Sequence, residues 1–257
     1  MKSWYRVENK AANGKTKVYI FDEIGYWGIT AKMFIESIKG LDDIDLHINS
    51  VGGSVIDALA IYHTLKQHDG VVDVYIDGLA ASSASAVAMA GKTIYMPENA
   101  FMMIHDPTVW ACGTSDDMKQ ALDLLNKTKD VLVNIYVNRS NHPRTAIEKA
   151  MSDTTWLTGS EAKAMGLVDV VTDEVKLAAK FNISDFKNVP SEIVARFTKQ
   201  ETPNLKEFES HLRDVFGFSK AEACTVAGHG LRALHRGDRG TETAAMLKSA
   251  ATTIQSL

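Results

Sequence analysis

A serine, a histidine and a pair of glycines stand at three points of this chain where an extended segment meets a turn. The β-branched run at 71–76 ends at Gly78, and Ser82 lies in the run of small, helix-compatible residues that follows the turn. His105 follows the apolar run at 101–104 and precedes a proline-containing turn. A neutral imidazole can take the proton from a serine hydroxyl and so make the serine a nucleophile. These residue types indicate nucleophilic catalysis at a carbonyl group.

The two adjacent glycines, Gly52 and Gly53, form a turn between an expected strand and an expected helix. Such turns present backbone N–H groups without side chains in the way, and they bind anions. The tetrahedral oxyanion of an acyl transfer needs two fixed donors. We expect the N–H of Gly52 and the N–H of Ser83, the residue after the nucleophile, to supply them.

Each of these features also has an ordinary structural interpretation. Ser82 fits the N-cap of a tightly packed helix, because a serine side chain accepts from free N–H groups in the first turn. His105 at a strand end fits a structural histidine, and diglycine turns recur in proteins that bind nothing there. Catalysis therefore requires all three features to meet at one place in the fold.

Composition narrows the class of protein. The chain has 257 residues, 45% of them apolar and 23% charged, with a net charge of -4. This charge disfavours a surface that binds nucleic acid, and no apolar run is long enough to span a membrane. Cys112 and Cys224 fit free thiols in a reducing compartment, without zinc-ligand spacing. With no signal peptide at the N-terminus, the sequence predicts a cytoplasmic protein.

No cofactor is predicted from the sequence. The run Gly-Lys-Thr at 91–93 resembles the end of a P-loop, but Ala86 stands where the earlier glycine is required. The element order there is helix and then strand, so backbone amides would not cradle a phosphate. Any use of ATP is therefore expected to belong to a partner.

Expected strands and helices alternate along the first two thirds of the chain, which predicts an α/β layered domain. The expected strands are 18–21, 44–48, 71–76, 93–96, 101–104 and 168–171. The expected helices are one capped by Thr30 and running to 38, 55–65, a buried helix of small residues that has Ser82 in its first turn and ends before Gly91, 115–138, one from 143, and 160–165. We divide the chain into a catalytic domain at 1–175, a linker at 176–201 without clear periodicity, and a helical C-terminal tail at 202–257.

Four motifs, in order, resemble those of the Clp peptidase proteolytic subunit family. They are Ile-Asn-Ser-Val-Gly-Gly at 48–53, Gly-Leu-Ala-Ala-Ser at 78–82, Met-Ile-His-Asp-Pro at 103–107, and Trp-Leu-Thr-Gly-Ser-Glu-Ala at 156–162 running into Gly-Leu-Val-Asp at 166–169. The resemblance covers roughly residues 17–172. One such motif is weak evidence, whereas four in family order are specific.

The resemblance implies an α/β fold of the ClpP and crotonase type, built from stacked β-β-α units, with a helical extension here. It implies that Ser82 is the nucleophile, His105 the base, and Gly52 with Ser83 the backbone oxyanion donors. It also implies homo-oligomeric rings, with the helix from residue 115 at the interface between rings. Its substrates would be proteins or peptides, with an AAA+ unfoldase as a possible partner.

The sequence departs from the family pattern at two places. Val51 stands where the family usually has proline, although both glycines are kept. Thr154 stands where the family has its catalytic Asp, and Asp153 lies one residue earlier. We expect Asp153 to orient His105; the alternatives are Thr154 or a backbone carbonyl. Asp169, in the last motif, is interpreted as structural.

The N-terminal Trp4-Tyr5, the turn at 26–30 and the segment at 208–223 resemble phage and prophage members of the family. Those members are prohead, or head-maturation, proteases that digest scaffold inside an assembling capsid. This resemblance implies scaffold or capsid proteins as substrates, and a place in the host cytoplasm or in the procapsid. It also suggests a tail that the enzyme trims itself.

Three other functions stay open at this stage. One is a catalytically idle scaffold or assembly protein on the same fold, which the tail favours slightly. Another is a housekeeping Clp proteolytic subunit that works with an ATP-dependent unfoldase. The third is an acyl-coenzyme A enzyme of the same superfold, although such enzymes generally work without a serine nucleophile.

Overall fold

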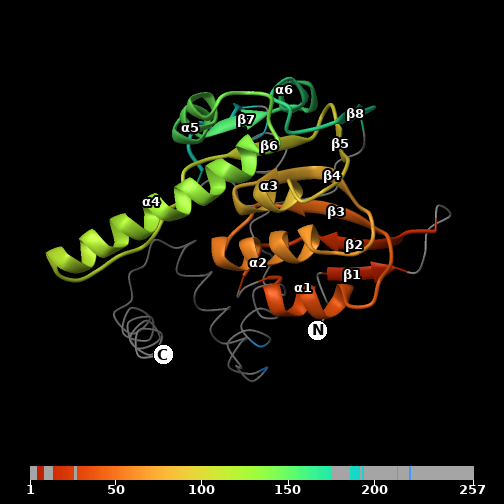
Figure 1. The fold of residues 1–257 in the computed structure, drawn as a ribbon, viewed down its shortest axis with the longest axis horizontal. Helices are drawn as coiled ribbons and strands as arrows, with labels where there is room; N and C mark the ends of the chain where they lie inside the picture. The colour runs from red at the N-terminus through yellow and green to blue at the C-terminus, as the bar shows by residue number, and fades with distance from the viewer. Residues whose placement is uncertain are drawn as a thin grey trace. The chain divides into compact units, whose positions relative to one another are not determined.

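The computed structural model describes residues 5–8, 14–25, 28–174, 186–191, 193, 213 and 220, with only the backbone described at 5–8. The chain separates into two compact units, Met1–Thr198 and Lys199–Leu257. Figure 1 labels the helices and strands of the first unit. The predicted tail at 202–257 lies outside the described residues except for Arg213 and Lys220, and so does most of the predicted linker. The account below concerns the first unit.

An eight-stranded, mostly parallel sheet forms the centre of the described domain. Its order is β1-β2-β3-β4-β5-β8, and β6 pairs with β4 and with β7. The β1–β2 and β6–β7 pairs are antiparallel, and all other pairs are parallel. The strands are β1 (Tyr5–Glu8), β2 (Thr16–Ile20), β3 (Ile44–Ser50), β4 (Val72–Ala81), β5 (Ile94–Pro97), β6 (Phe101–Ile104), β7 (Thr155–Leu157) and β8 (Val170–Thr172). The predicted α/β fold class is confirmed.

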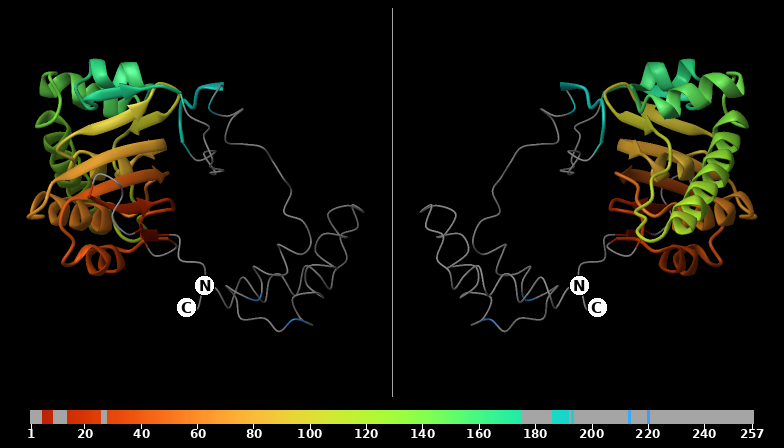
Figure 2. Two further views of the ribbon diagram at one scale, coloured as in Figure 1. Left: turned by 90° about the vertical axis from the view of Figure 1, so that its right-hand side faces the viewer. Right: turned by 90° about the vertical axis from the view of Figure 1, so that its left-hand side faces the viewer.

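The helices pack together on one face of this sheet, as the two side views show (Figure 2). They are α1 (Ala31–Ile38), α2 (Val55–Lys66), α3 (Ser83–Ala88), α4 (Ser115–Val137), α5 (Arg144–Ser152) and α6 (Gly159–Ala164). The predicted cap of the first helix is confirmed, because the Thr30 side chain accepts from the Met33 N–H. The predicted Pro143 boundary is confirmed as well, because Pro143 is the N-cap of α5.

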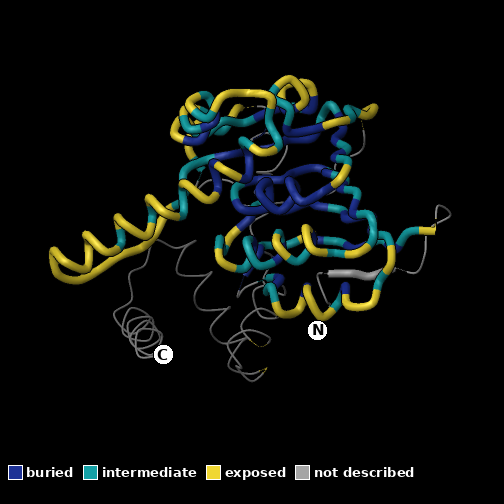
Figure 3. The backbone as a smooth tube through the Cα atoms, in the orientation of Figure 1, coloured by how far each residue is buried: buried dark blue, intermediate teal, exposed yellow. Residues whose placement is uncertain are grey.

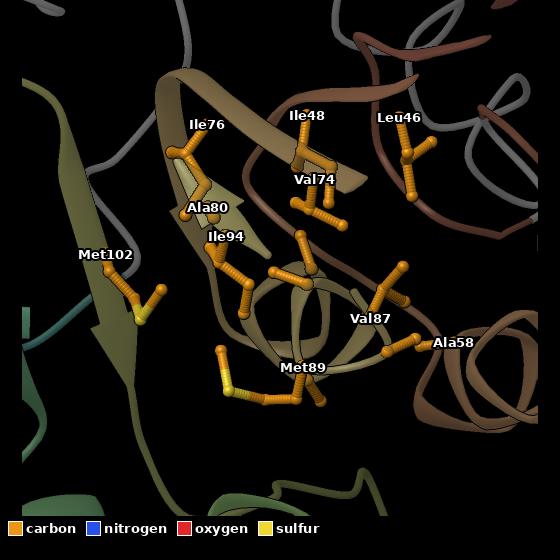
Figure 4. Packing of buried hydrophobic residues seen from close by; sticks show 14 of the residues in the cluster. Leu46, Ile48, Ala58, Val74, Ile76, Ala80, Val87, Met89, Ile94 and Met102 are labelled. Atoms are coloured by element: carbon orange, nitrogen blue, oxygen red, sulfur yellow. The ribbon is translucent and has the colours of Figure 1, made fainter. Parts of the chain in front are cut away.

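The alternation of apolar residues in β3 and β4 builds the core beneath α3. Leu46 lies beside Val74 and Ile48 beside Ile76, so that both strands present branched side chains to the same face (Figure 4). All six residues of α3 are buried, and three of them are alanines. Small side chains let this helix lie close to the sheet and to α2, which is what the run of small residues after Ser82 predicts.

β4 is longer than predicted, and its two halves have different partners. The sequence suggested an end at Gly78, but the strand continues to Ala81. Its first half pairs with β5 through Val74 and Tyr75, whereas Leu79–Ala81 pair with β6. The Asn49 side chain accepts from the Leu79 N–H at 3.1 Å, where the register with β3 shifts. The last residues of β4 are thereby placed beside the strand that leads to His105.

α4 begins at a capping box, in which the Thr114 hydroxyl and the Asp117 carboxylate exchange hydrogen bonds with each other's backbone N–H groups. Its buried residues, Leu132, Val133, Ile135 and Tyr136, all lie near its C-terminal end. The first half extends away from the body of the domain and is exposed (Figure 3). Leu122 and Leu124 on that half are 56% and 57% exposed. Only the last turns of α4 therefore contribute to the core.

Candidate active site

The hydroxyl of Ser82 lies 2.6 Å from Nε2 of His105, within hydrogen-bonding distance. Ser82 sits at the end of β4 and His105 just beyond β6, and these two segments are neighbours in the sheet. Ser82 occupies the N-cap position of α3, but its side chain makes no capping hydrogen bond. The hydroxyl is directed to the imidazole instead, so the interpretation of Ser82 as a simple capping serine does not describe this turn.

The backbone of Ser82 is strained, with φ 54 and ψ -129. A non-glycine residue in this region costs about 1–3 kcal/mol and persists only where its surroundings hold it there. The Ser82 N–H donates to the Met103 carbonyl at 2.9 Å, across the pairing of β4 with β6. The nucleophile and the strand that leads to the base are therefore joined by the backbone as well as by their side chains.

Two hydroxyl groups, those of Ser85 and Tyr136, stabilise the backbone of this turn by hydrogen bonds. The Ser85 Oγ lies 2.6 Å from the Ser82 carbonyl, 3.0 Å from the Met103 carbonyl and 2.8 Å from the Tyr136 hydroxyl. Because Ser85 has a single hydroxyl proton and faces two carbonyls, Tyr136 is the donor in the Tyr136–Ser85 bond. Burial raises the pKa of Tyr136 to about 12, so the phenol is neutral and keeps the proton that it donates.

Gly52 packs directly against the nucleophile turn. Its φ is +88, and a Cβ placed on it would lie 2.6 Å from the Ala81 carbonyl oxygen and 2.8 Å from the Ser83 nitrogen. Only glycine fits here, because a side chain would collide with backbone that cannot move independently of Ser82. The diglycine turn and the serine turn, which are far apart in the sequence, therefore lie against each other as predicted.

The backbone N–H groups of the two turns differ in whether they already donate a hydrogen bond. The Gly52 N–H donates to the Ser50 hydroxyl at 3.1 Å, and that hydroxyl donates to the Asp22 carbonyl at 2.5 Å. The Ser83 N–H belongs to the first residue of α3 and has no acceptor within its helix. Among the described residues, no hydrogen bond is found for the N–H of Gly53.

His105 packs against an aromatic ring, and no carboxylate is hydrogen-bonded to it among the described residues. The Phe186 ring packs edge-to-face against the imidazole, with centroids 6.0 Å apart at 77°. Among the described residues, His105 Nδ1 has no hydrogen-bond partner. Burial lowers the pKa of His105, and the neighbouring Asp106 opposes this shift. Asp106 itself forms an ion pair with Lys129 at 2.7 Å.

Asp153, the sequence-based candidate for orienting His105, lies at the C-cap of α5. Its carboxylate pairs with Lys149 at 2.5 Å, and both side chains are more than half exposed. No hydrogen bond joins it to His105 among the described residues. Its backbone carbonyl accepts from the Asn188 side chain at 2.8 Å. The Asp169 carboxylate accepts a hydrogen bond from the Ile94 N–H at 2.7 Å and forms an ion pair with Arg139, which fits the structural role expected for it.

Sequence reasoning missed the part that residues 186–193 take in this site. Phe186 contacts both His105 and Trp156, and Asn188 holds the Asp153 carbonyl. Among the described residues, three non-glycine residues have positive φ, and all three belong to this neighbourhood: Ser82, Thr154 and Asn188. Strain of this kind gathers at functional sites. The signal in the sequence was weak, because the segment has no clear periodicity.

Two further searches concern only the described part of the chain. No cluster of three or more His, Cys, Asp or Glu side chains there is arranged to hold a metal ion. No helix there combines the length and the apolar character that crossing a bilayer requires.

Comparison with known proteins places this geometry in a family. Residues 20–175 match the Clp protease family. The chain is also 32% identical, over 155 residues, to the ATP-dependent Clp protease proteolytic subunit 1 of Chlamydia pneumoniae; this covers 55% of the present chain and 81% of that protein. The chain belongs to the Clp protease family and is a serine endopeptidase of the ClpP type. Proteins of this family form oligomeric rings that work with ATPases.

Proposed function

We propose that Ser82 and His105 carry out peptide-bond hydrolysis in this chain. His105 Nε2 accepts the Ser82 proton while the Oγ attacks the substrate carbonyl carbon. The resulting imidazolium then protonates the leaving amine. Water, deprotonated by the same imidazole, releases the acyl group from Ser82. The observation that carries this proposal is the 2.6 Å separation of Ser82 Oγ and His105 Nε2.

The oxyanion of the tetrahedral intermediate needs two donors beside Ser82. We assign one to the N–H of Ser83, at the start of α3. For the other, the structure favours the N–H of Gly53 over that of Gly52, because the Gly52 N–H is already bonded to Ser50. Gly52 then contributes by letting the two turns approach, and Gly53 by donating.

We propose that the biological role is that of a phage or prophage prohead protease, which cleaves scaffold or capsid proteins. The support is the sequence beyond the family match at 20–175, which includes the second compact unit at Lys199–Leu257. The N-terminal Trp4-Tyr5 and the segment at 208–223 resemble such proteins. The chain would act as a homo-oligomeric ring, in the host cytoplasm or inside the procapsid.

The test compares the parent protein with the Ser82→Ala and His105→Ala variants. We expect a fluorophosphonate probe to label the parent at Ser82 and neither variant. Casein digestion should fall by about 10³-fold or more in both variants, as losses of catalytic residues do. A parent protein that is folded but inert to the probe would instead support the idle scaffold alternative.

A second experiment separates the prohead role from a housekeeping role. In one assay the parent protein is incubated with capsid scaffold protein alone. In the other it is incubated with a stably folded substrate, in the presence or absence of an AAA+ unfoldase and ATP. Cleavage of scaffold without unfoldase supports the prohead role. Degradation that depends on ATP and the unfoldase would favour the housekeeping role. Comparing the intact masses of the parent and Ser82→Ala proteins also tests whether the tail is trimmed by the enzyme.

A further inference from the structure

Residues 186–191 and 193, within the predicted linker, pack on the catalytic domain instead of leaving it. Figure 2 shows this segment beside the strands, on the side of the sheet away from the helices. Ile193 is fully buried in a small cluster with Leu79, Ala81, Phe101 and Met103. These residues belong to the ends of β4 and β6, which carry Ser82 and lead to His105. The segment therefore covers the second face of the strands that hold the catalytic pair.

The segment is tied to the site by more than apolar contact. The Trp156 indole N–H donates to the Lys187 carbonyl at 3.2 Å. The Asn188 side chain donates to the Asp153 carbonyl at 2.8 Å. Phe186 stands just before these two anchors, and its ring packs edge-to-face on Trp156 with centroids 5.9 Å apart. The position of the Phe186 ring is thus fixed from the segment's own backbone and from Trp156.

The same Phe186 ring packs edge-to-face against the His105 imidazole. In a serine protease a carboxylate usually accepts from Nδ1 of the imidazole, so that Nε2 faces the hydroxyl. Here the two nearby carboxylates are paired with lysines, Asp106 with Lys129 and Asp153 with Lys149. An edge-to-face ring fixes the plane of an imidazole without a hydrogen bond, and it also excludes water from it.

We propose that Phe186 is a positioning residue for His105, which holds the imidazole toward Ser82 and shields it from solvent. This inference rests on the proposed function, in which His105 is the base. Phe186 lies outside the residues that match the family, 20–175, so the arrangement belongs to the additional sequence of this chain. Phe186, although it lies in the predicted linker, is then part of the active site.

The proposal predicts a change in the pH profile. His105 works as a base only when neutral, so activity falls as the pH drops through its pKa. Burial lowers that pKa in the parent protein, and loss of the Phe186 ring would admit water and raise it toward about 6.5. The acidic limb of kcat/KM should therefore move to higher pH in Phe186→Ala. The pairs Asp106–Lys129 and Asp153–Lys149 stay in place, so they do not produce the shift.

The test measures probe labelling and peptide hydrolysis against pH for the parent, Phe186→Ala, Phe186→Leu and Val189→Ala. We expect Phe186→Ala to lower kcat by about tenfold with little change in KM, the scale of one lost aromatic contact. Phe186→Leu keeps apolar bulk and should lie between Phe186→Ala and the parent. Val189 packs in the same cluster but has no ring that could fix the plane of the His105 imidazole, so Val189→Ala should keep the parental pH profile.

Histidine NMR titration gives a readout that does not need activity. In the Ser82→Ala background, the His105 resonance, assigned by its loss in His105→Ala, should titrate at higher pH when Phe186 is alanine. An unchanged titration and an unchanged kcat in a folded Phe186→Ala protein would overturn the proposal. If the parent itself is not labelled at Ser82, the proposed function fails, and the titration still decides whether Phe186 shields His105.

Discussion

Ser82 and His105, the two residues of the catalytic pair, are held in place by different kinds of contact. Ser82 is fixed from several directions by the Met103 carbonyl, by the Ser85–Tyr136 hydroxyl pair and by the close approach of Gly52. Apart from the contact of its Nε2 with Ser82, His105 has a ring contact with Phe186, and its Nδ1 has no hydrogen bond among the described residues. Both side chains are half-buried, but the turn of the nucleophile is held by several hydrogen bonds and a close backbone approach, whereas the imidazole of the base is held by a ring contact.

Because of this difference, we expect substitutions near Ser82 and substitutions near His105 to affect stability and activity in different proportions. Changes around Ser82 disturb buried backbone and buried hydroxyl groups, so they should lower the free energy of unfolding together with the rate. Changes around His105 affect half-buried or exposed groups and should alter the rate or its pH dependence with less effect on folding. Each prediction below tests one side of this contrast.

The largest effect is expected from Gly52→Ala. The added Cβ would lie within 3 Å of the backbone of Ala81 and Ser83, and alanine tolerates φ +88 poorly. Displacement of the turn would misplace the oxyanion donors, and kcat should fall by about 10²–10³-fold. Unfolding in urea should show a loss of at least about 1–3 kcal/mol. Fluorophosphonate labelling and urea titration together measure both quantities.

Ser83→Ala is the matched control for this change. It lies in the same contact but keeps the backbone N–H that is assigned as a donor. Its buried hydroxyl has no partner among the described residues, so removing it should leave stability equal or slightly higher. Unchanged activity in Gly52→Ala, or a large loss in Ser83→Ala, would contradict the assignment of catalysis to these backbone groups.

Much of this arrangement could be predicted from the sequence, because it depends on local pattern. Alternating branched residues at 44–48 and 71–76 predicted two of the central strands, and small residues after Ser82 predicted the buried helix. The continuation of β4 to Ala81 was missed, since Gly78 is typical of a strand end. It is stabilised by pairing with β6, which is a tertiary contact.

The base side was harder to predict for the same reason. Phe186 and Asn188 reach His105 and Asp153 from a segment without helical or strand periodicity, so nothing local to 186–193 indicates where it packs. The family pattern suggested Asp153 by proximity in the sequence to Thr154. Whether a carboxylate faces the imidazole depends on the α5–β7 turn, where Thr154 has φ 54. Residue order alone does not specify that turn.

A moderate effect is expected from Tyr136→Phe. The phenol donates to Ser85, and its loss leaves a buried hydroxyl oxygen with an unfilled acceptor site. The free energy of unfolding should fall by about 1–3 kcal/mol, with a smaller loss of labelling rate at Ser82. Tyr62→Phe is the control, because no hydrogen bond is found for the Tyr62 hydroxyl in the described structure. Equal stabilities of the two variants would show that the buried pair does not brace the nucleophile turn.

The smallest effect is expected from Asp153→Asn, although the family pattern makes Asp153 the candidate third catalytic residue. Its carboxylate is exposed and paired with Lys149, and its contact with the Phe186 segment uses the backbone carbonyl, which the variant keeps. The lost ion pair should cost less than about 1 kcal/mol. We expect kcat to change by less than about threefold, whereas removal of a carboxylate that orients the base costs about 10⁴-fold. Steady-state kinetics of Asp153→Asn and Phe186→Ala, measured together, therefore decide whether the carboxylate or the ring positions His105. A collapse of kcat in Asp153→Asn with a mild effect in Phe186→Ala would assign that function to the carboxylate, and it would require Asp153 to leave Lys149 when substrate binds.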